Sequence, residues 1–343
     1  MPYISNFNKM LKAPKFWFSE KDSAVFFSKI LFPLSVIWKF FSKRRIVNGK
    51  YEEFTIPIIC VGNINIGGSG KTPTTISLAK MFLENKTKVH IISKGYKGVI
   101  KGPKKVNETD DAYGVGDEPI LMSKFAPVWV AKQRRNAIIA AIEDGAELLI
   151  LDDGFQDPSI KKTLSIITVD AEIAFGNRKI LPSGPLREPI PDALSRADIL
   201  LVIGRKQQRE RFMKSIDLPN ELNVFGAEMK VVESDIHLDK AKFVAVAGIG
   251  HPEKFFNSIE KFGGEIIKKF SLPDHENYTP RLLRKLKKAS LNNNAKLITT
   301  EKDFVRIPKN ERHNFIFLPI KLKFSEELEL IKSIKSVINQ SFK

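Results

Sequence analysis

The stretch Val61–Thr75, VGNINIGGSGKTPTT, combines closely spaced glycines with a lysine and a hydroxyl residue. Glycines let backbone N–H groups approach phosphate oxygens, while Lys71 can reach terminal phosphates and the Thr72 hydroxyl suits Mg²⁺. The usual pattern G-x-x-x-x-G-K-[ST] has glycine at position 65, and Asn65 stands there instead. Asparagine tolerates positive φ better than most residues, so the stretch still predicts a nucleotide-phosphate site.

A second candidate element is the apolar run Leu148–Leu151, which leads into two acids, Asp152 and Asp153. A phosphate-loop enzyme needs a carboxylate at the end of a nearby strand to hold magnesium from the opposite side. Sites in open α/β sheets form at that carboxyl end. Two adjacent acids can instead belong to a turn or cap a helix. Beside a phosphate loop, however, the pair favours an NTPase or a kinase.

Several other short segments place charged or aromatic residues among glycines and prolines, and their order resembles one family. The sequence is similar to the tetraacyldisaccharide 4'-kinases of lipid A synthesis. The motifs that carry the resemblance are VGNINIGGSGKTP, SKGYKG, VGDEP, DDGFQ, LPSGPLRE, AGIGHPEKFF, PDHENYTP and TTEKD. Each motif alone is weak, but the ordered set from Val61 to Asp303 is specific. In that family the position of Asn65 is normally not glycine either.

The resemblance implies transfer of the ATP γ-phosphate to the 4'-hydroxyl of an acylated glucosamine disaccharide 1-phosphate, giving lipid IVA. Such a reaction depends on positioning and charge neutralisation more than on covalent help. Lys71 would steady the phosphates, Thr72 and Asp152 would lie near Mg²⁺, and Asp153 would share the metal or contact the acceptor. The ATP-binding loop would comprise Asn65, Ile66, Gly67, Gly68, Ser69, Gly70, Lys71 and Thr72.

The resemblance also implies that Asp117 is the catalytic base and that His275 supports it. A carboxylate paired with an imidazole can accept the proton of a sugar hydroxyl. From the residues alone, Asp117 could equally cap a helix at Gly116–Pro119, and His275 could be a loop histidine that only hydrogen-bonds. The choice between Asp117 and Asp153 as the base stays open.

Further site residues follow from the same resemblance. The implied substrate contacts are Lys94, Tyr96, Gln156, Arg187 and Arg134, and Glu188 is an implied metal ligand. Arg187 and Glu188 could instead form a plain surface ion pair, and Arg134 lies in a basic run that could simply be solvated. The chain departs from the family pattern at two positions. Lys94 stands where arginine is usual, which loses a bidentate phosphate fork, and Asp157 replaces a histidine.

The elements that must position these residues alternate between apolar runs and helical patterns, which predicts an α/β fold. We expect a P-loop NTPase-like, mostly parallel sheet with helices on both faces, plus a second, smaller α/β domain. A closing amphipathic helix is predicted over 325–338. The predicted strands are Phe54–Cys60, Val89–Ile92, Val128–Val130, Leu148–Leu151, Ser165–Val169, Ile199–Ile203, Lys242–Ala247, Glu265–Lys268, Lys296–Thr299 and Asn314–Leu318.

Weak sequence signals predict three regions. Residues 1–50 would form an N-terminal membrane-interface region, and residues 51–165 the phosphate-loop kinase domain, to which 305–343 would return. Residues 166–304 would form the second domain, with the active site in the cleft between the two domains.

The run Ala24–Phe41, AVFFSKILFPLSVIWKFF, is the most apolar part of the chain and precedes a basic cluster, Lys43–Arg45. Its eighteen residues would span roughly 27 Å as a helix, but Lys29, Lys39 and Pro33 interrupt it. One polar face and otherwise apolar faces favour an amphipathic helix in a membrane interface over a soluble helix or a true span. We therefore expect a peripheral protein on the cytoplasmic face of the inner membrane.

The 343 residues carry 56 Lys and Arg against 39 Asp and Glu, a net charge of +17, which favours an anionic partner. We expect the acylated disaccharide lipid and an anionic membrane surface, no nucleic acid, and a monomer. The single cysteine, Cys60, excludes an internal disulfide and a cysteine-based metal cluster. The alternative class is a phosphate-loop ATPase or GTPase that acts as a switch or delivers a metal, but its guanine-reading loop and Cys/His cluster are not evident.

Overall fold

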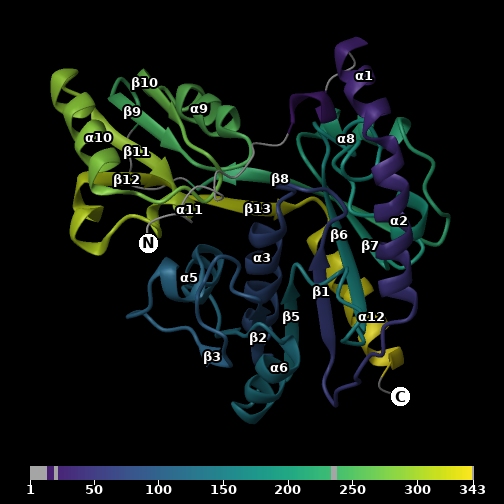
Figure 1. Ribbon diagram of the computed structural model, residues 1–343. Helices are drawn as coiled ribbons and strands as arrows, with labels where there is room; N and C mark the ends of the chain where they lie inside the picture. The colour runs from purple at the N-terminus through teal and green to yellow at the C-terminus, as the bar shows by residue number, and fades with distance from the viewer. Residues whose placement is uncertain (1–13, 19–21, 233–237, 342–343) are drawn as a thin grey trace, which may run out of the picture. The chain divides into compact units, whose positions relative to one another are not determined.

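The computed structural model describes residues 14–18, 22–232 and 238–341. These residues form two compact units (Figure 1). The large unit consists of the described residues in 16–230 and 320–341, and the small unit of residues 14–15 and the described residues in 231–319. Each unit has its own sheet and its own buried core.

The large unit is built on a nine-stranded sheet in the order β13-β8-β7-β6-β1-β5-β2-β4-β3. The pairs from β8 through β4 are parallel, and β3 joins β4 antiparallel. The strands are β1 Ile58–Gly62, β2 Val89–Ser93, β3 Lys104–Lys105, β4 Val128–Val130, β5 Leu148–Asp152, β6 Leu164–Asp170, β7 Ile199–Ile203, β8 Asn223–Val231 and β13 Ile320–Phe324.

Helices cover both faces of this sheet, as predicted (Figure 1). Successive residues of a strand point to opposite faces, so Ile59 and Val61 of β1 belong to one core cluster, while Ile58 and Cys60 belong to the other. On the first face lie α3 Lys71–Glu84, α5 Asp117–Ser123 and α12 Glu327–Ser341; on the second lie α6 Arg134–Glu143, α7 Ile190–Leu194 and α8 Lys206–Lys214. The predicted closing helix, α12, thus returns to the large unit.

Strand β1 lies between β5 and β6 at the centre of the sheet. All five residues of β1 and of β5 are buried, because both faces of these strands are covered. Since the paired strands run parallel, the residues that follow β1, β5 and β6 emerge at the same edge. The phosphate loop, Asp152 and Asp153 are therefore brought together by the sheet itself.

The small unit has a parallel four-stranded sheet in the order β10-β9-β11-β12. Two apolar clusters, one containing Val244 and Val246 and the other Phe243 and Ala245, pack on its two faces. Its elements are β9 Lys242–Ala247, α9 Pro252–Lys261, β10 Glu265–Ser271, α10 Pro280–Asn292, β11 Lys296–Thr300, α11 Glu301–Phe304, the 3₁₀ helix Lys309–Asn314 and β12 Phe315–Leu318. The predicted second α/β domain is therefore present.

The predicted domain limits differ from the compact units. The segment 166–230 supplies most of β6 and all of β7, together with β8, which continues to Val231, and these strands extend the large sheet. The segment 305–319, predicted to return to the first domain, forms β12 of the small sheet. The limits at 165 and 305 differ from the units because strand pairing decides sheet membership: β6 pairs with β1, which lies far away in the sequence, and β12 pairs with β11.

The predicted N-terminal helical run is two helices, α1 Asp22–Ile30 and α2 Phe32–Val47, and Pro33 stands in the first turn of α2. Two serines of its polar face are buried: Ser28 Oγ donates to Ser183 O at 2.9 Å, and Ser35 Oγ donates to Ile180 O at 2.8 Å. The large apolar side chains around them are exposed. No helix in the described ranges is both long enough and apolar enough to cross a membrane.

Candidate active site

The loop between β1 and α3 has the open backbone of a phosphate cradle. Gly67 and Gly70 have φ values of 116° and 84°, which residues with a side chain rarely adopt. A Cβ atom added at Gly67 or Gly68 would meet no atom within 4 Å, so the space beside the loop is open. Gly70 immediately precedes Lys71, the first residue of α3. The loop amides and the positive end of the helix dipole therefore lie together.

Asn65 has a different role from the glycine it replaces. Its backbone forms an antiparallel bridge with Leu186, and its Nδ2 donates to Ala174 O at 2.7 Å. Among the described residues of this loop, the positive φ values belong to Gly67 and Gly70, not to Asn65. Tolerance of positive φ is therefore the wrong explanation for asparagine here. The position ties the loop to the segment 174–186, and nucleotide contact by Asn65 and Ile66 stays a prediction.

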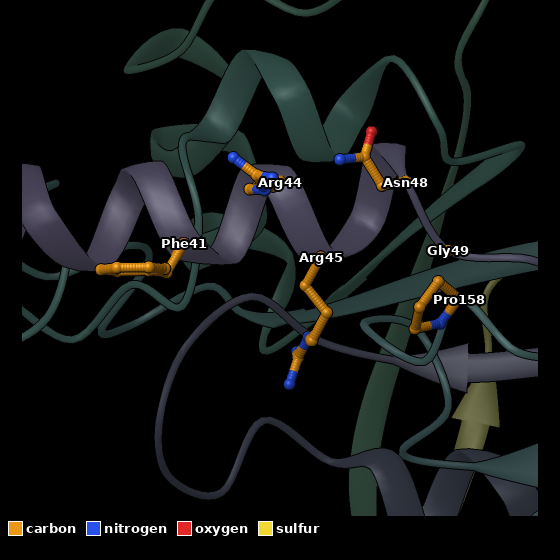
Figure 2. Close-up of a pocket in the computed structure, with 6 residues that line it drawn as sticks. All are labelled: Phe41, Arg44, Arg45, Asn48, Gly49 and Pro158. Atoms are coloured by element: carbon orange, nitrogen blue, oxygen red, sulfur yellow. The ribbon is translucent and has the colours of Figure 1, made fainter.

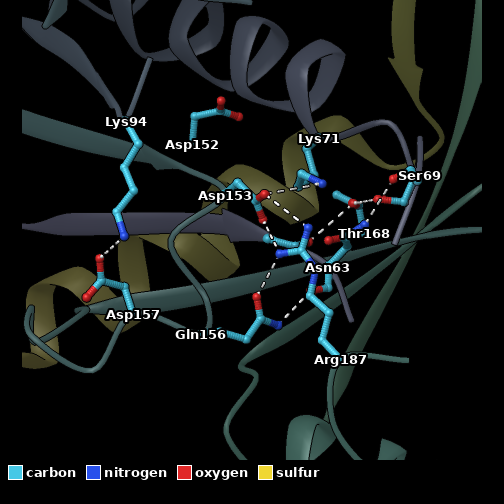
Figure 3. A network of polar contacts seen from close by, with 12 residues as sticks. Asn63, Ser69, Lys71, Lys94, Asp152, Asp153, Gln156, Asp157, Thr168 and Arg187 are labelled. Atoms are coloured by element: carbon cyan, nitrogen blue, oxygen red, sulfur yellow. Dashed lines mark hydrogen bonds and ion pairs between the residues drawn. The ribbon is translucent and has the colours of Figure 1, made fainter. Parts of the chain in front are cut away.

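Lys71, Asp153 and Arg187 form one charged group at the end of β5 (Figure 3). Lys71 Nζ lies 3.7 Å from Asp153 Oδ2. The Arg187 guanidinium holds both carboxylate oxygens of Asp153, at 2.9 and 3.2 Å. Burial opposes ionisation of Asp153, but the charges of Lys71 and Arg187 outweigh it and lower its pKa to about 2. Asp153 is therefore an anion held by two cations, and Arg187 does not pair with Glu188 as a surface pair.

Asp152, the last residue of β5, differs from Asp153 both in its partners and in the direction of its pKa shift. It is buried, and its Oδ1 has no hydrogen-bond partner. Burial, followed by the charges of Glu118 and Asp153, raises the pKa of Asp152 to about 7. A buried carboxylate with an unsatisfied oxygen is a costly arrangement that a cation would relieve. Over the described ranges, no three His, Cys, Asp or Glu side chains gather as a metal site.

Arg134 holds the backbone of this acidic turn. Its guanidinium donates to Asp152 O at 3.0 Å, to Asp153 O at 2.6 Å and to the Asp157 carboxylate at 2.6 Å. The side chain is buried, so the solvated alternative is wrong. Lys94 Nζ lies 3.2 Å from the same Asp157 carboxylate. The two departures from the family pattern, Lys94 and Asp157, are thus partners in one ion pair (Figure 3).

Gln156 links the acidic turn to the LPSGPLRE segment. Its Nε2 donates to Asn63 O at 2.8 Å and to Glu188 Oε1 at 3.0 Å, and its Oε1 accepts from Arg187 Nη1 at 3.0 Å. Glu188 is buried and also pairs with Arg196. The protein itself therefore supplies partners for Glu188, and its role as a metal ligand stays a prediction.

Asp117 begins α5 and is buried, with its Oδ1 accepting from Glu118 N at 3.0 Å. The N-cap residue is Gly116, and the Asp117 carboxylate accepts from a backbone N–H group of the first turn of α5. Gly116 also makes a close approach: a Cβ atom there would lie 2.7 Å from Tyr96 O. The SKGYKG and VGDEP segments therefore pack directly on one another, which brings Tyr96, exposed at 56%, beside the start of α5.

His275 lies in the small unit, in the loop after β10, with its Nε2 3.2 Å from Lys302 Nζ and 3.7 Å from Asp274 Oδ1. Asp117 lies in the large unit. The support of Asp117 by His275, and an active site between the two domains, stay predictions.

Comparison with known proteins decides the family. A model of the family described as tetraacyldisaccharide-1-P 4'-kinase matches residues 27–339. This chain belongs to that family. It is 38% identical over 331 residues to the tetraacyldisaccharide 4'-kinase of Jannaschia sp. (strain CCS1), covering 96% of this chain and 100% of that protein. It is 39% identical to the one of Paramagnetospirillum magneticum, covering 91% and 94%.

A solved structure agrees with the family assignment. LpxK from Aquifex aeolicus, crystallised in complex with ATP, is 26% identical and superposes with a TM-score of 0.72. The match covers 91% of this chain and 99% of that chain. The predicted phosphate-loop architecture and the use of ATP are therefore confirmed for this kinase family member.

Four residues of the site escaped the sequence reasoning. Asn63 and Thr168 support the loop: Asn63 O accepts from Gln156, and Thr168 Oγ1 lies 3.0 Å from Ser69 Oγ. Glu118 raises the pKa of Asp152, and Arg196 pairs with Glu188. Asn63 and Thr168 lie just after and near the carboxyl ends of β1 and β6, and that position was the one signal available.

Proposed function

We propose that this protein transfers the γ-phosphate of ATP to the 4'-hydroxyl of an acylated glucosamine disaccharide 1-phosphate. Membership of the tetraacyldisaccharide-1-P 4'-kinase family supports the substrate class. The observation that carries the proposal is the group at the end of β5, where Lys71 and Arg187 flank Asp153 beside an open glycine loop. The family match gives no support to a GTPase switch or a metal-delivery protein.

The residues of the loop and of α3 bind and neutralise the transferred phosphoryl group. Backbone amides near Gly67 and Gly68 approach the phosphates, and Lys71 supplies a positive charge to the oxygens on which negative charge develops. Because the loop runs directly from the buried strand β1 into α3, little reorganisation is needed when ATP binds. This positioning supplies most of what phosphoryl transfer requires from a protein.

The residues present fit a magnesium ion. Mg²⁺ is usually held by one or two carboxylates together with substrate phosphates and water. The unsatisfied Oδ1 of buried Asp152 provides such a carboxylate, and the hydroxyl of Thr72 follows Lys71 at the start of α3. When bound, the ion neutralises charge on the β- and γ-phosphates.

Proton removal from the sugar hydroxyl is assigned to Asp117, with His275 as its support and Asp153 as the competing candidate. Arg187 and Lys71 hold Asp153 as an anion of very low basicity, which favours Asp117 as the proton acceptor. Tyr96, Lys94 and Gln156 are the remaining candidates for substrate contact.

A transfer assay tests this function. Purified protein with Mg-ATP is incubated with acylated disaccharide 1-phosphate in mixed micelles, and the lipid is analysed by mass spectrometry. We expect a product one phosphate heavier, formed much faster than ATP is hydrolysed by water. ATP hydrolysis stimulated by DNA or RNA, without a phosphorylated lipid, would contradict the proposal.

Membrane attachment through α1 and α2 is part of the proposal. Phe26, Phe32, Phe40 and Phe41 are 57–63% exposed, whereas Ser28 and Ser35 point into the protein. A helix that buries its serines and exposes its phenylalanines suits a hydrocarbon boundary better than water. The basic end of α2 suits an anionic headgroup layer on the cytoplasmic face of the inner membrane.

The end of α2 also contacts the site. Figure 2 shows the pocket there, which is lined by Phe41, Arg44, Arg45, Asn48, Gly49 and Pro158. Arg45 Nη2 donates to Gln156 O at 3.3 Å, and Trp38 Nε1 donates to Arg187 O at 3.1 Å. A helix lying on the lipid surface would therefore hold the substrate-side residues close to that surface.

Vesicle sedimentation tests the membrane contact. In the variant Phe40→Ser/Phe41→Ser, we expect clearly weaker binding to anionic phospholipid vesicles and unchanged ATP affinity. Phe262→Ser is the matched control, because Phe262 is an exposed phenylalanine of the small unit. If the wild type, Phe40→Ser/Phe41→Ser and Phe262→Ser sedimented equally with the vesicles, the proposed interfacial helix would be refuted.

A further inference from the structure

The TTEKD segment, which the proposed function leaves without a role, forms a closed polar cluster in the small unit. Thr300 precedes α11, and its Oγ1 accepts from Asp303 N at 3.0 Å and donates to Asp303 Oδ2 at 2.6 Å. Asp303 has no exposed surface, and the side chain of Arg306, its ion-pair partner, is 4% exposed. A carboxylate and a guanidinium this deeply buried incur a large desolvation cost.

This buried pair holds the turn after β9. Gly248 N donates to both Asp303 carboxylate oxygens, at 3.1 and 3.0 Å, and Gly248 O accepts from Arg306 Nη2 at 2.8 Å. A Cβ atom at Gly248 would lie 2.9 Å from Asp303 Oδ1 and 3.0 Å from Pro273 O. Glycine is therefore required at this position so that the pair and the loop of Pro273 can both approach the backbone.

The same groups hold the backbone of His275. His275 N donates to Gly248 O at 3.4 Å, and Arg306 Nη1 donates to Glu276 O at 3.2 Å. Arg306 thus donates to the carbonyl of Glu276, the residue after His275, and to Gly248 O, the same carbonyl that accepts from His275 N. His275 has a φ of 59°, a conformation that costs free energy unless the surroundings impose it. Through Gly248 O and Glu276 O, Arg306 is hydrogen-bonded to the backbone that carries this conformation.

The imidazole ring is held by the same segment. Lys302 Nζ lies 3.2 Å from His275 Nε2 and 3.5 Å from Asp274 Oδ1. An ammonium group only donates, so this contact is a hydrogen bond when Nε2 accepts and the ring proton is on Nδ1. That tautomer can donate from Nδ1 to a carboxylate, which is the support that the proposed function asks of His275.

We propose that Lys302, Asp303 and Arg306 are positioning residues for His275: the buried pair fixes the loop backbone, and the lysine selects the ring tautomer. The inference rests on the proposed function, in which His275 supports the catalytic base. If the cluster served stability alone, apolar side chains of similar volume would serve as well. Two contacts end on His275 itself, from Gly248 O and Lys302 Nζ, and a third from Arg306 holds the next residue, Glu276; their convergence on one histidine indicates positioning instead.

Steady-state kinetics of Lys302→Met, alone and combined with His275→Ala, test the inference. Because misplacing a group near the chemistry costs up to about 10²-fold in rate, we expect Lys302→Met to lower kcat by roughly 10-fold to 100-fold with the KM for ATP unchanged. In the His275→Ala background, Lys302→Met should lower kcat no further. Losses that multiply, or a normal kcat for Lys302→Met beside a low kcat for His275→Ala, would overturn the inference.

The matched control is Lys287→Met. Lys287 belongs to the same unit and pairs with both oxygens of Glu311 at 3.0 Å. We expect this variant to keep the kcat of the wild type. If it lost as much activity as Lys302→Met, loss of any lysine ion pair in the small unit would explain both results, and the positioning role would be rejected.

A spectroscopic measurement separates this inference from the proposed function. In ¹⁵N-labelled full-length protein, the imidazole nitrogens of His275 should show the Nδ1–H tautomer in the wild type and in Lys287→Met, with a shift towards Nε2–H in Lys302→Met. Arg306→Lys should broaden or move the same signals while the small unit stays folded. A wild-type Nε2–H tautomer would overturn the inference, whereas a wild type that phosphorylates no lipid defeats only the proposed function.

Discussion

The two sheets of this protein each carry a charged cluster near strand carboxyl ends, but only one cluster is satisfied. In the small unit, Asp303 is bonded to Arg306, Thr300 and Gly248 and has no exposed surface. In the large unit, Asp152 is almost as buried, yet one of its oxygens has no partner. The two carboxylates are similarly buried but differ in hydrogen bonding. Asp303, which has its partners, stabilises the fold, whereas Asp152, which lacks one, is suited to bind a ligand.

Adjacent residues within the large unit repeat the contrast. Asp153 has Lys71 and Arg187, and its pKa falls to about 2, whereas burial raises the pKa of Asp152 to about 7. The chain sets these two carboxylates apart through their neighbours, not through their position in the sequence. Substitutions in the two clusters should therefore differ in sign as well as in size.

The largest effect is expected at Lys71. Lys71→Ala removes the charge that faces the transferred phosphoryl group, so kcat should fall by at least about 10³-fold while the fold is kept. Lys80→Ala on the same helix is the control, because the Lys80 ammonium lies over the Phe125 ring, 4.1 Å from its centroid. Initial-rate assays at saturating ATP measure both. If the kcat of Lys71→Ala stayed within 10-fold of the wild-type value, the phosphates of ATP would have to bind away from Lys71.

Asp303→Asn should lower the free energy of unfolding by about 3 kcal/mol, because it removes the carboxylate charge that faces the buried guanidinium of Arg306. Urea unfolding of the full chain measures this loss. Glu311→Gln, which breaks a half-exposed ion pair of the same unit, should cost less than about 1 kcal/mol. Similar losses of unfolding free energy for the two variants would show that the buried Asp303 cluster contributes no more to stability than a half-exposed ion pair.

Asp152→Asn should raise the free energy of unfolding, whereas Asp303→Asn should lower it. The measurement uses nucleotide-free protein with a chelator present. The wild-type carboxyl has a raised pKa, so its folded form binds more protons than the unfolded chain, and stability declines as the pH rises from about 4 through 7. Asparagine carries no charge to bury, so at pH 8 the melting temperature should rise by a few degrees, roughly 1 kcal/mol in stability. A lower melting temperature at pH 8 would mean that Asp152 is satisfied within the protein.

The smallest effect is expected at His90, a buried histidine outside both clusters. Burial lowers its pKa, and its Nδ1 accepts from Trp129 Nε1 at 3.3 Å, with Asp144 and Lys105 beside it. The unfolded chain then binds more protons, so His90 destabilises the protein as the pH falls below about 6.5. His90→Gln should reduce the drop in melting temperature between pH 7.5 and 5.5 by about a degree. If the drop in melting temperature were unchanged in His90→Gln, titratable groups other than His90 would cause it.

Sequence reasoning found most of the architecture because buried parallel strands are locally distinct. The strands at Val128–Val130, Ile199–Ile203 and Lys242–Ala247 have the predicted limits, since each is a short apolar run between turn residues. Strand β1 begins at Ile58 and not at Phe54, because Pro57 lacks an N–H group for the ladder. The strand β8, half-exposed and mixed in composition, gave no such signal.

The site could be predicted as a set of residues but not as a set of contacts. Lys71, Asp153, Gln156 and Arg187 were all expected, and the structure brings them within one network of hydrogen bonds and ion pairs. That Arg187 holds Asp153, that Arg134 holds the turn, and that Lys94 pairs with Asp157 depend on side chains from distant segments. Pairwise contacts of this kind leave no periodic pattern in a sequence.

By itself, the sequence determined the phosphate loop, the acid-ended strand, the α/β class and the resemblance to one kinase family, because glycine spacing and apolar periodicity are local properties of a chain. Only the tertiary structure decided that Oδ1 of Asp152 lacks a partner while Asp153 has two, and that Ser28 of α1 and Ser35 of α2 face inward. Those outcomes depend on which groups from remote segments share a buried space, where an ion is stabilised only by the neighbours that folding supplies.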